Sequence, residues 1–148
     1  MGEKVDLLAA AVAAGLKGDL RLLRRVFPAW HGPDGRPDSG NFKLDPDGSG
    51  TSMTVWLAEV DYAAVVAGHD NFGVVWVPVA TLISEQLSIV HDPLEHDPHH
   101  VLIVGKRNDN AMRRIRDVSQ WVRYPTPYKL TNPPELPKIA AWTDKLSD

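Results

Sequence analysis

The sequence predicts a small single α+β domain, with three to five short strands, helices on one face and a proline-rich C-terminal tail. Three observations predict this class. A length of 148 residues suits one domain with a modest core. Its 43% hydrophobic and 24% charged residues are ordinary globular values. Short apolar runs of strand type alternate with segments whose apolar residues recur at helical spacing, which is typical of mixed layers.

Helices are expected where apolar residues recur every three or four positions. Residues 4–16 have this spacing and lie within an N-terminal helical segment, 1–18. A short helix is expected from Leu20 to Phe27, capped by Asp19 and ended by Pro28. Others are expected at 61–67, at 81–86 and, for about 14 residues, after Asn108 or Asp109.

Strands are expected at 52–57, 74–80, 87–90 and 101–105, where apolar and β-branched residues dominate. The polar stretches 31–50 and 91–100 are expected to be loops. We therefore place a compact domain at 1–124. Residues 125–148 form a proline-rich tail, which either wraps the domain or docks on another chain.

Charge is unevenly distributed along a chain whose formal net charge is −3. No Lys or Arg occurs between Lys43 and Lys106, whereas nine acidic residues do. From Lys106 to Lys129, seven basic residues face only Asp109 and Asp117. The domain either carries a dipole that steers a charged partner or neutralises itself by packing the acidic middle beside the basic helix.

The chain contains no cysteine, which excludes disulfides, thiolate metal sites and thiol nucleophiles. No apolar run approaches the roughly 18 residues that a membrane span needs. We expect a cytoplasmic protein with no membrane partner and no cofactor.

Three sequence motifs of this chain occur in the same order in a known group of proteins. They are L-x-R-R-V-x-P, D-G-R-P-x-S-x-x-F and D-P-x-x-x-x-P-x-H-x-x-x-x-G-K. The residues that carry them here are Leu22, Arg24, Arg25, Val26 and Pro28; Asp34, Gly35, Arg36, Pro37, Ser39 and Phe42; and Asp92, Pro93, Pro98, His100, Gly105 and Lys106. In these motifs the chain resembles a group of small uncharacterised bacterial proteins. The resemblance implies a bacterial origin and a compact domain, but no activity.

The loop HDPLEHDPHH is the densest cluster of potential metal ligands. His91, His96, His99 and His100 are the alternative ligand set for a first-row metal ion. The competing interpretation is a solvated loop in which Asp92 and Asp97 stabilise turns before prolines. His100 opens a buried strand, where it is either a structural residue or a catalytic acid or base.

The segment DGRPDSGNF has the composition of an anion-binding loop, with Arg36 as a bidentate donor and Ser39 as a hydroxyl. With Arg25 and His100 it would form the pocket of a small enzyme. The competing interpretation is a turn shaped by Gly35, in which Arg36 pairs with a neighbouring aspartate.

Two further groups favour binding. Arg113, Arg116 and Arg123 line one side of the expected basic helix and suit a protein or, secondarily, a nucleic acid. Trp30 and Trp142 lie in loop-like contexts, where tryptophan is a frequent interface anchor.

The absence of a complete catalytic motif favours a non-catalytic protein-binding or regulatory module, such as a regulator, immunity factor, antitoxin or complex subunit. Its partner would be another protein or a second copy. The alternative is a small enzyme that acts on a nucleotide, NAD or phosphoester substrate through Arg25, Arg36, Ser39 and His100.

Overall fold

The computed structural model describes residues 21–45, 48–56 and 59–136, and its centre is a single antiparallel sheet. The strands are β1 (Arg21–Val26), β2 (Thr51–Val55), β3 (Gly73–Pro78), β4 (Ser88–His91), β5 (His100–Val104) and β6 (Gln120–Arg123). The helices are α2 (Glu59–Val66), α3 (Val79–Ser84), α4 (Asp109–Val118) and the 3-10 turn η1 (Ser39–Phe42). The expected helix at 4–16 and Trp142 lie outside the described residues.

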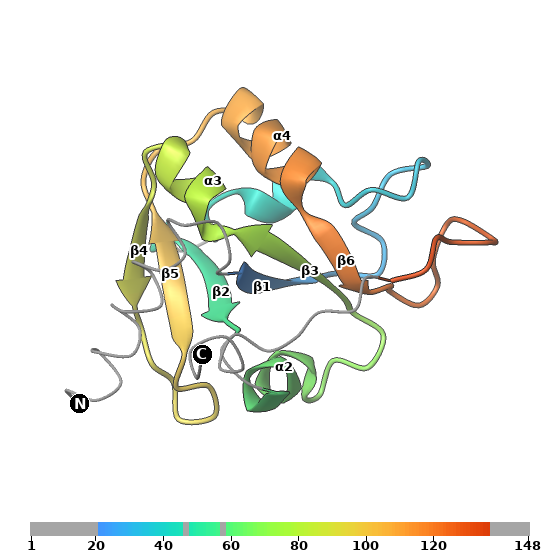
Figure 1. Cartoon of the computed structure of the whole chain (residues 1–148), viewed down its shortest axis with the longest axis horizontal. Helices are drawn as coiled ribbons and strands as arrows, with labels where there is room; N and C mark the ends of the chain where they lie inside the picture. The colour runs from blue at the N-terminus through green and yellow to red at the C-terminus, as the bar shows by residue number, and fades with distance from the viewer. Residues whose placement is uncertain (1–20, 46–47, 57–58, 137–148) are drawn as a thin grey trace, which may run out of the picture.

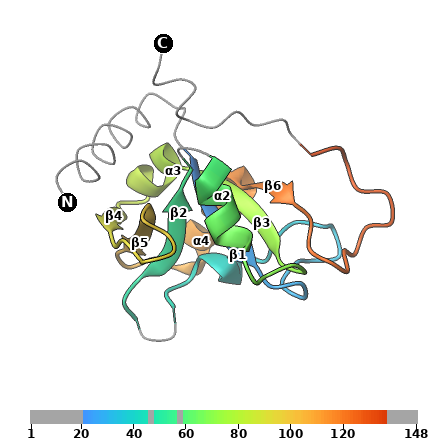
Figure 2. The same cartoon turned by 90° about the horizontal axis from the view of Figure 1, so that it is seen from below.

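The six strands lie in the order β4-β5-β2-β1-β3-β6, and each neighbouring pair is antiparallel. In Figure 1, α3 and α4 lie above the sheet and α2 lies below it. Figure 2 views the sheet from the side of α2, which lies across the central strands. The prediction of three to five strands with helices on one face is therefore wrong: this sheet is larger and both of its faces carry helices.

The segment from Leu20 to Phe27 is the first source of that error, because its described part is the central strand β1 and not a helix. Leu22 pairs with Val55 of β2 on one side and with Val77 of β3 on the other. A helix this short has little stability of its own. Pairing on both edges satisfies the backbone groups of β1 and overrides the helical spacing of its apolar residues.

The second source of error is the end of α4, which was expected to continue to about Val122. Asn108 caps the helix as expected, by accepting a hydrogen bond from the Ala111 amide at 2.8 Å. Ser119 then adopts extended backbone angles and ends the helix. The next four residues pair with β3 as the edge strand β6, so the sheet gains a strand that helical spacing had hidden.

Most of the core lies between the sheet and the layer formed by α3, α4 and η1. Fully buried side chains from all of these elements meet there: Leu22, Val26, Phe42, Val77, Leu82, Ile103 and Ile115. The face under α2 has a smaller apolar cluster, formed by Leu23, Trp56, Val65 and Val74. The two hollows described in the next subsection lie on this second face and at its edges.

Candidate functional site

An exposed aromatic groove lies where β1 ends. Phe27 contacts Trp30 and Phe72, with ring centroids 5.0 and 4.7 Å apart, although Phe27 is 50% and Trp30 39% exposed. Together with Leu44 and Lys43, these rings line a hollow of about 390 Å³. We call this hollow the aromatic groove; its remaining lining residues are Arg24, Arg25, Gly40, Asn41, Asp45, Ser52 and His69.

Two tight turns bring the rings of the groove together. Pro28 follows β1, and the Trp30 amide donates to the Phe27 carbonyl at 2.9 Å. The Phe72 amide donates to the His69 carbonyl at 3.1 Å in the turn that precedes β3. The antiparallel pairing of Val26 with Gly73 sets these two turns side by side.

The groove carries unbalanced positive charge. Arg24 faces Asp45 at 3.5 Å and donates to the Ser52 carbonyl at 2.9 Å, so its charge is largely compensated. Burial lowers the pKa of Arg24, and Asp45 opposes that shift. Within the described ranges no ion pair joins Arg25 or Lys43 to an acidic side chain. Lys43 and Arg25 can therefore attract a negatively charged ligand, although Arg25 also donates to the Val65 carbonyl at 3.1 Å and lies in the field of the Asp97 carboxylate.

A second hollow lies beside the groove, between α2, the loop 92–99 and the strands β1 and β2. We call it the polar cavity; it measures about 320 Å³ and shares Arg24, Arg25 and Ser52 with the groove. Its other lining residues are Leu23, Met53, Thr54, Ala64, Val65, Leu94, His96, Asp97 and His100. The apolar side chains come from β1, β2, α2 and the loop, and the polar ones come from β1, β2, β5 and the loop.

Asp97 is the most unusual group in the wall of this cavity. It is only 4% exposed, and its Oδ2 accepts a hydrogen bond from Thr54 Oγ1 at 2.5 Å. Its Oδ1 is buried and has no hydrogen-bond partner in the part of the chain that the structure describes. Two backbone hydrogen bonds between Leu94 and Asp97 hold the turn that positions this carboxylate.

Asp97 also acts electrostatically on Arg25. Partial desolvation lowers the pKa of the Arg25 guanidinium, and the negative charge of Asp97 opposes that shift. The Arg25 guanidinium itself donates to the Val65 carbonyl at the end of α2, at 3.1 Å. The cavity wall therefore contains the buried Asp97 carboxylate and the guanidinium groups of Arg24 and Arg25, and no hydrogen bond among the described residues joins Asp97 to either arginine.

The loop histidines have separate partners. His91 Nε2 lies 3.1 Å from the Pro98 carbonyl, and His99 Nδ1 lies 2.6 Å from an Asp61 carboxylate oxygen. His100 Nδ1 lies 2.9 Å from the Asp92 carbonyl and 3.2 Å from its carboxylate. Among the described residues no three His, Cys, Asp or Glu side chains are grouped so that they could hold a metal ion. These contacts make the loop a hydrogen-bonded connection, with Asp97 in a turn as expected but buried rather than solvated.

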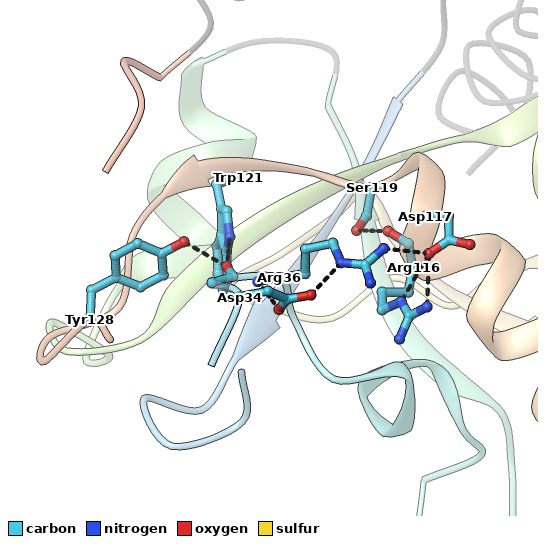
Figure 3. Close-up of polar contacts among 8 residues, drawn as sticks. Asp34, Arg36, Arg116, Asp117, Ser119, Trp121 and Tyr128 are labelled. Atoms are coloured by element: carbon cyan, nitrogen blue, oxygen red, sulfur yellow. Dashed lines mark hydrogen bonds and ion pairs between the residues drawn. The ribbon is translucent and has the colours of Figure 1, made fainter. Parts of the chain in front are cut away.

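The DGRP segment forms a hydrogen-bonded turn that anchors the chain after β6 (Figure 3). The Gly35 carbonyl accepts from Trp121 Nε1 at 2.8 Å and from the Tyr128 hydroxyl at 2.6 Å. The amides that an anion would need are already bonded: Gly35 donates to the Gly32 carbonyl, and Arg36 to the Asp34 carboxylate. The turn interpretation therefore fits this segment better than an anion cradle.

The Arg36 side chain is held by two aspartates. Its Nε donates to Asp34 at 2.8 Å, and one terminal nitrogen donates to Asp117 of α4 at 3.1 Å (Figure 3). Hydrogen bonds from the Arg36 amide and side chain lower the pKa of Asp34, and the bond to Asp34 raises the pKa of Arg36. The turn interpretation expected Arg36 to pair with a neighbouring aspartate, either Asp34 or Asp38, and the structure shows Asp34.

The four residues of the enzyme alternative are divided between sites. Arg25 and His100 line the polar cavity. Arg36 lies in the turn described above, and Ser39 begins η1 on the other side of the sheet. Neither Arg36 nor Ser39 is among the residues that line the cavity.

The basic side chains around α4 are largely engaged within the protein. Arg116 pairs with Asp117 at 2.9 Å, and Arg123 donates to the Phe72 and His69 carbonyls at 3.0 and 2.7 Å. Arg113 donates to the Asn110 side chain at 3.3 Å. Arg114 binds Glu85 through two nitrogens, both at 2.7 Å, which is a contact between the acidic middle and the basic helix. These contacts favour internal neutralisation over a continuous phosphate-binding track.

Sequence reasoning singled out Trp30, Arg25 and His100, but it missed their neighbours. The sequence pattern places Phe27 at the end of a helix and Asp97 in a turn before a proline, and it gives Phe72 no role. One signal was present for the aromatic groove: three large aromatic residues occur beside turn-forming prolines and glycines. No local pattern connects Asp97 with Thr54, because 43 residues separate them.

No protein-family model, curated protein or solved structure matches this chain. Across the described ranges, no helix has the length and apolar character that a membrane crossing requires.

Proposed function

We propose that this chain is a non-catalytic, cytoplasmic protein-binding module, which holds an acidic segment of a partner protein in the aromatic groove. The observation that carries the proposal is the exposure of Phe27 and Trp30, whose rings contact each other at the surface. Apolar area left in water forgoes about 25 cal/mol per Å². Grouped aromatic rings at a surface are therefore typical of an interface, where tryptophan contributes strongly to affinity.

The charge of the groove supports an acidic partner. Arg25 and Lys43 lie on its lining, and the Lys43 ammonium lies 5.8 Å from the centre of a Trp30 ring. An Asp or Glu that flanks an aliphatic or aromatic side chain would contact these cations while the apolar side chain covers Phe27 and Trp30. This arrangement suits a regulator, an immunity factor, an antitoxin or a subunit of a complex.

The same rings and cations would also suit a single-stranded nucleic acid, but the rest of the surface favours a protein. Affinity for nucleic acid grows with the number of phosphates that basic residues neutralise. Arg114, Arg116 and Arg123 are already bonded to carboxylates or backbone carbonyls, and the whole chain has a net charge of −3. Two cations beside an apolar surface match a short acidic peptide better.

A displayed library of short random peptides tests the proposal directly. We expect selection on the wild-type protein to enrich peptides in which Asp or Glu flanks Leu, Phe or Trp. Trp30→Ala is expected to weaken their binding at least about tenfold, equivalent to about 1.4 kcal/mol. The variant keeps its loop, because the Trp30 carbonyl, which accepts from Asp38 and Asn41, belongs to the backbone.

Lys43→Glu separates the contribution of charge to peptide affinity from the contribution of the aromatic rings. It is expected to weaken acidic peptides and to reduce the salt dependence of their binding. Val118→Ala is the matched control, because Val118 is an exposed aliphatic residue on α4 and does not line the groove.

Three results would overturn the proposal. The first is a set of selected peptides that bind Trp30→Ala as tightly as wild type. The second is fluorescein-labelled oligo-dT that binds more tightly than any peptide and depends on Trp30. The third is a dimer in sedimentation that Trp30→Ala dissociates, which would assign the groove to a second copy of the chain.

A further inference from the structure

We infer that a second surface of the domain binds a proline-rich segment of a partner protein, in the extended polyproline conformation. This surface is formed by the rings of Trp121, Tyr124 and Tyr128, and we call it the tyrosine surface. None of the three rings lines the aromatic groove. The inference therefore goes beyond the proposed function and rests on different observations.

The three rings form one contiguous aromatic surface at the end of β6. The ring centroids of Tyr124 and Tyr128 lie 4.4 Å apart, and the Trp121 ring lies 6.0 and 5.8 Å from them. The Trp121 indole nitrogen and the Tyr128 hydroxyl both donate to the Gly35 carbonyl, which fixes these two rings against the turn (Figure 3). All three residues are only half-buried. Proline-rich ligands bind to fixed, accessible aromatic surfaces of this kind.

A hollow of about 450 Å³ lies against the tyrosine surface, and it lies within the size range of ligand sites. Leu130 and Leu136 add apolar walls to it. The two arginines of its lining, Arg36 and Arg116, both contact Asp117, so their charges are compensated within the protein. Contact with aromatic and aliphatic side chains, and not charge, therefore selects the ligand of this hollow.

Residues 131–136 of this chain, with the sequence TNPPEL, already contact the tyrosine surface. The Tyr124 hydroxyl donates to the Pro134 carbonyl at 2.5 Å, and Pro134 lines the hollow. A proline fixes its own φ and restricts the preceding residue to extended backbone, so Asn132, Pro133 and Pro134 favour the polyproline conformation. Backbone carbonyls in that conformation have no internal partner. They are therefore the acceptors that a tyrosine hydroxyl can bind, and this segment shows the mode of contact that a partner's segment would use.

The internal segment is held weakly. In the part of the chain that the structure describes, the bond from Tyr124 is the only hydrogen bond that joins residues 131–136 to the rest of the protein. Residues 131–135 are exposed, and Figures 1 and 2 show the chain after β6 as a loop that extends away from the sheet. A segment with so few contacts opens at a low cost in free energy. A proline-rich segment of a partner can therefore replace it, and the internal segment acts as a competitor.

Fluorescence anisotropy of labelled peptides tests the inference on the full chain. The probe is fluorescein-labelled TNPPEL, and its control is TNAAEL, which lacks both prolines. We expect wild type to bind TNPPEL weakly, because the internal segment competes at an effective concentration of roughly millimolar order. Combining Pro133→Gly with Pro134→Gly frees the internal segment from the polyproline conformation. This double variant should bind TNPPEL at least about fivefold more tightly than wild type does, and at least about fivefold more tightly than it binds TNAAEL.

Tyr124→Phe, added to the double variant, isolates the hydroxyl and keeps the ring. It should weaken TNPPEL binding about threefold or more, because the hydrogen bond to the proline carbonyl is lost. Tyr62→Phe in the same background is the matched control: Tyr62 lies on α2 and does not line the hollow, so its loss of a hydroxyl should leave the affinity unchanged. The comparison of TNPPEL with TNAAEL needs neither tyrosine variant, so it tests the inference even if one of them is unstable.

The inference is overturned if the double variant binds neither peptide, if it binds TNAAEL as tightly as TNPPEL, or if Tyr124→Phe leaves the TNPPEL affinity unchanged. Binding of TNPPEL that Trp30→Ala abolishes would instead place the peptide in the aromatic groove. A wild-type dimer in sedimentation that the double variant loses would assign the surface to exchange of residues 131–136 between two copies of the chain. Acidic peptides are tested separately through Trp30→Ala, so failure of the proposed function and failure of this inference are distinguishable.

Discussion

The two faces of the sheet differ in what covers them, although the same strands supply both. Toward α3, α4 and η1, β1 presents Leu22 and Val26, which join a continuous apolar core around Phe42. Toward α2, the same strand presents Leu23 and Arg25, and β2 and β5 add polar groups such as Thr54 and His100. The first face is filled with side chains, whereas the second contains a hollow.

This difference shows how a small domain combines stability with a binding surface. Successive side chains of a strand point to opposite faces, so one strand contributes both to the core and to the binding surface. The filled face buries most of the apolar side chains that stabilise the fold. The face under α2 is therefore free to keep buried polar groups that would weaken a domain with no other core.

The largest expected effect follows from the filled face. Phe42 is completely buried among core side chains, so Phe42→Ala should reduce the free energy of unfolding by about 3–5 kcal/mol. That loss is a large part of the roughly 5–15 kcal/mol that stabilises a typical domain. Urea unfolding followed by circular dichroism measures it.

Two matched variants test whether the two faces of the sheet contribute differently to the free energy of unfolding. Leu23→Ala, on the hollow face, should cost about 2–3 kcal/mol, because the cavity beside it already limits its contacts. Phe27→Ala, half exposed in the aromatic groove, should cost less than about 1 kcal/mol. A larger loss for Leu23→Ala than for Phe42→Ala would show that the two faces contribute in the opposite order.

The next effect concerns the turn that joins the filled side to the segment after β6. Gly35 has a φ of +82°, and a Cβ there would lie 2.5 Å from the Tyr128 hydroxyl oxygen. Gly35→Ala should therefore lower the free energy of unfolding by about 2–3 kcal/mol, from backbone strain and displacement of Tyr128 together. Trp121 fluorescence should change as well, because its indole nitrogen donates to the Gly35 carbonyl.

Gly68 provides the control that separates these two causes. It has a similar φ of +73°, but apart from its own chain neighbours no atom of the described residues lies within 4 Å of the position that a Cβ would take. Gly68→Ala should show the backbone strain alone, about 1–2 kcal/mol, with no change in Trp121 emission. Equal losses for the two variants would mean that the contact between Gly35 and Tyr128 contributes nothing.

The fold could be predicted from the sequence only where local pattern and tertiary pairing agree. The strand 101–105 and the Asn108 cap were found because an apolar run and a capping side chain are local signals. β1 was missed because its arginines resemble the polar side of a helix. Their actual partners are distant: Arg21 lies 4.3 Å from the centre of a Trp76 ring, and Arg24 donates to Ser52.

The candidate sites were predictable to a smaller extent, for the same reason. Trp30 and Arg25 attracted attention by residue type, and both line the aromatic groove. The polar cavity depends on Asp97 reaching Thr54 of a strand that precedes it by 43 residues. That contact arises from the pairing of β2 with β5, which brings Thr54 opposite His100, and no motif in the chain encodes it.

The smallest expected effect is a change of the free energy of unfolding with pH, and it also concerns the filled side of the sheet. His31 is 2% exposed and stacks on Tyr128 with ring centroids 5.0 Å apart. Its Nε2 accepts a hydrogen bond from the Lys129 amide at 2.9 Å, which requires a neutral ring. Burial lowers the pKa of His31 below its ordinary value of 6.5, and the Lys129 ammonium lowers it further.

The sign of the effect follows from proton uptake. Below about pH 6.5 the unfolded chain binds a proton at His31 that the folded protein excludes, so stability falls as the pH decreases toward the lowered pKa. Above pH 6.5 both states are neutral at this residue and the contribution is constant. Urea midpoints at pH 7.5, 6.5 and 5.5 should therefore decline more steeply for wild type than for His31→Gln, whose amide oxygen accepts from Lys129 without titrating. Parallel declines would assign the pH dependence to other groups, and the contact between residues 128–130 and the His31 turn would then be insensitive to protonation.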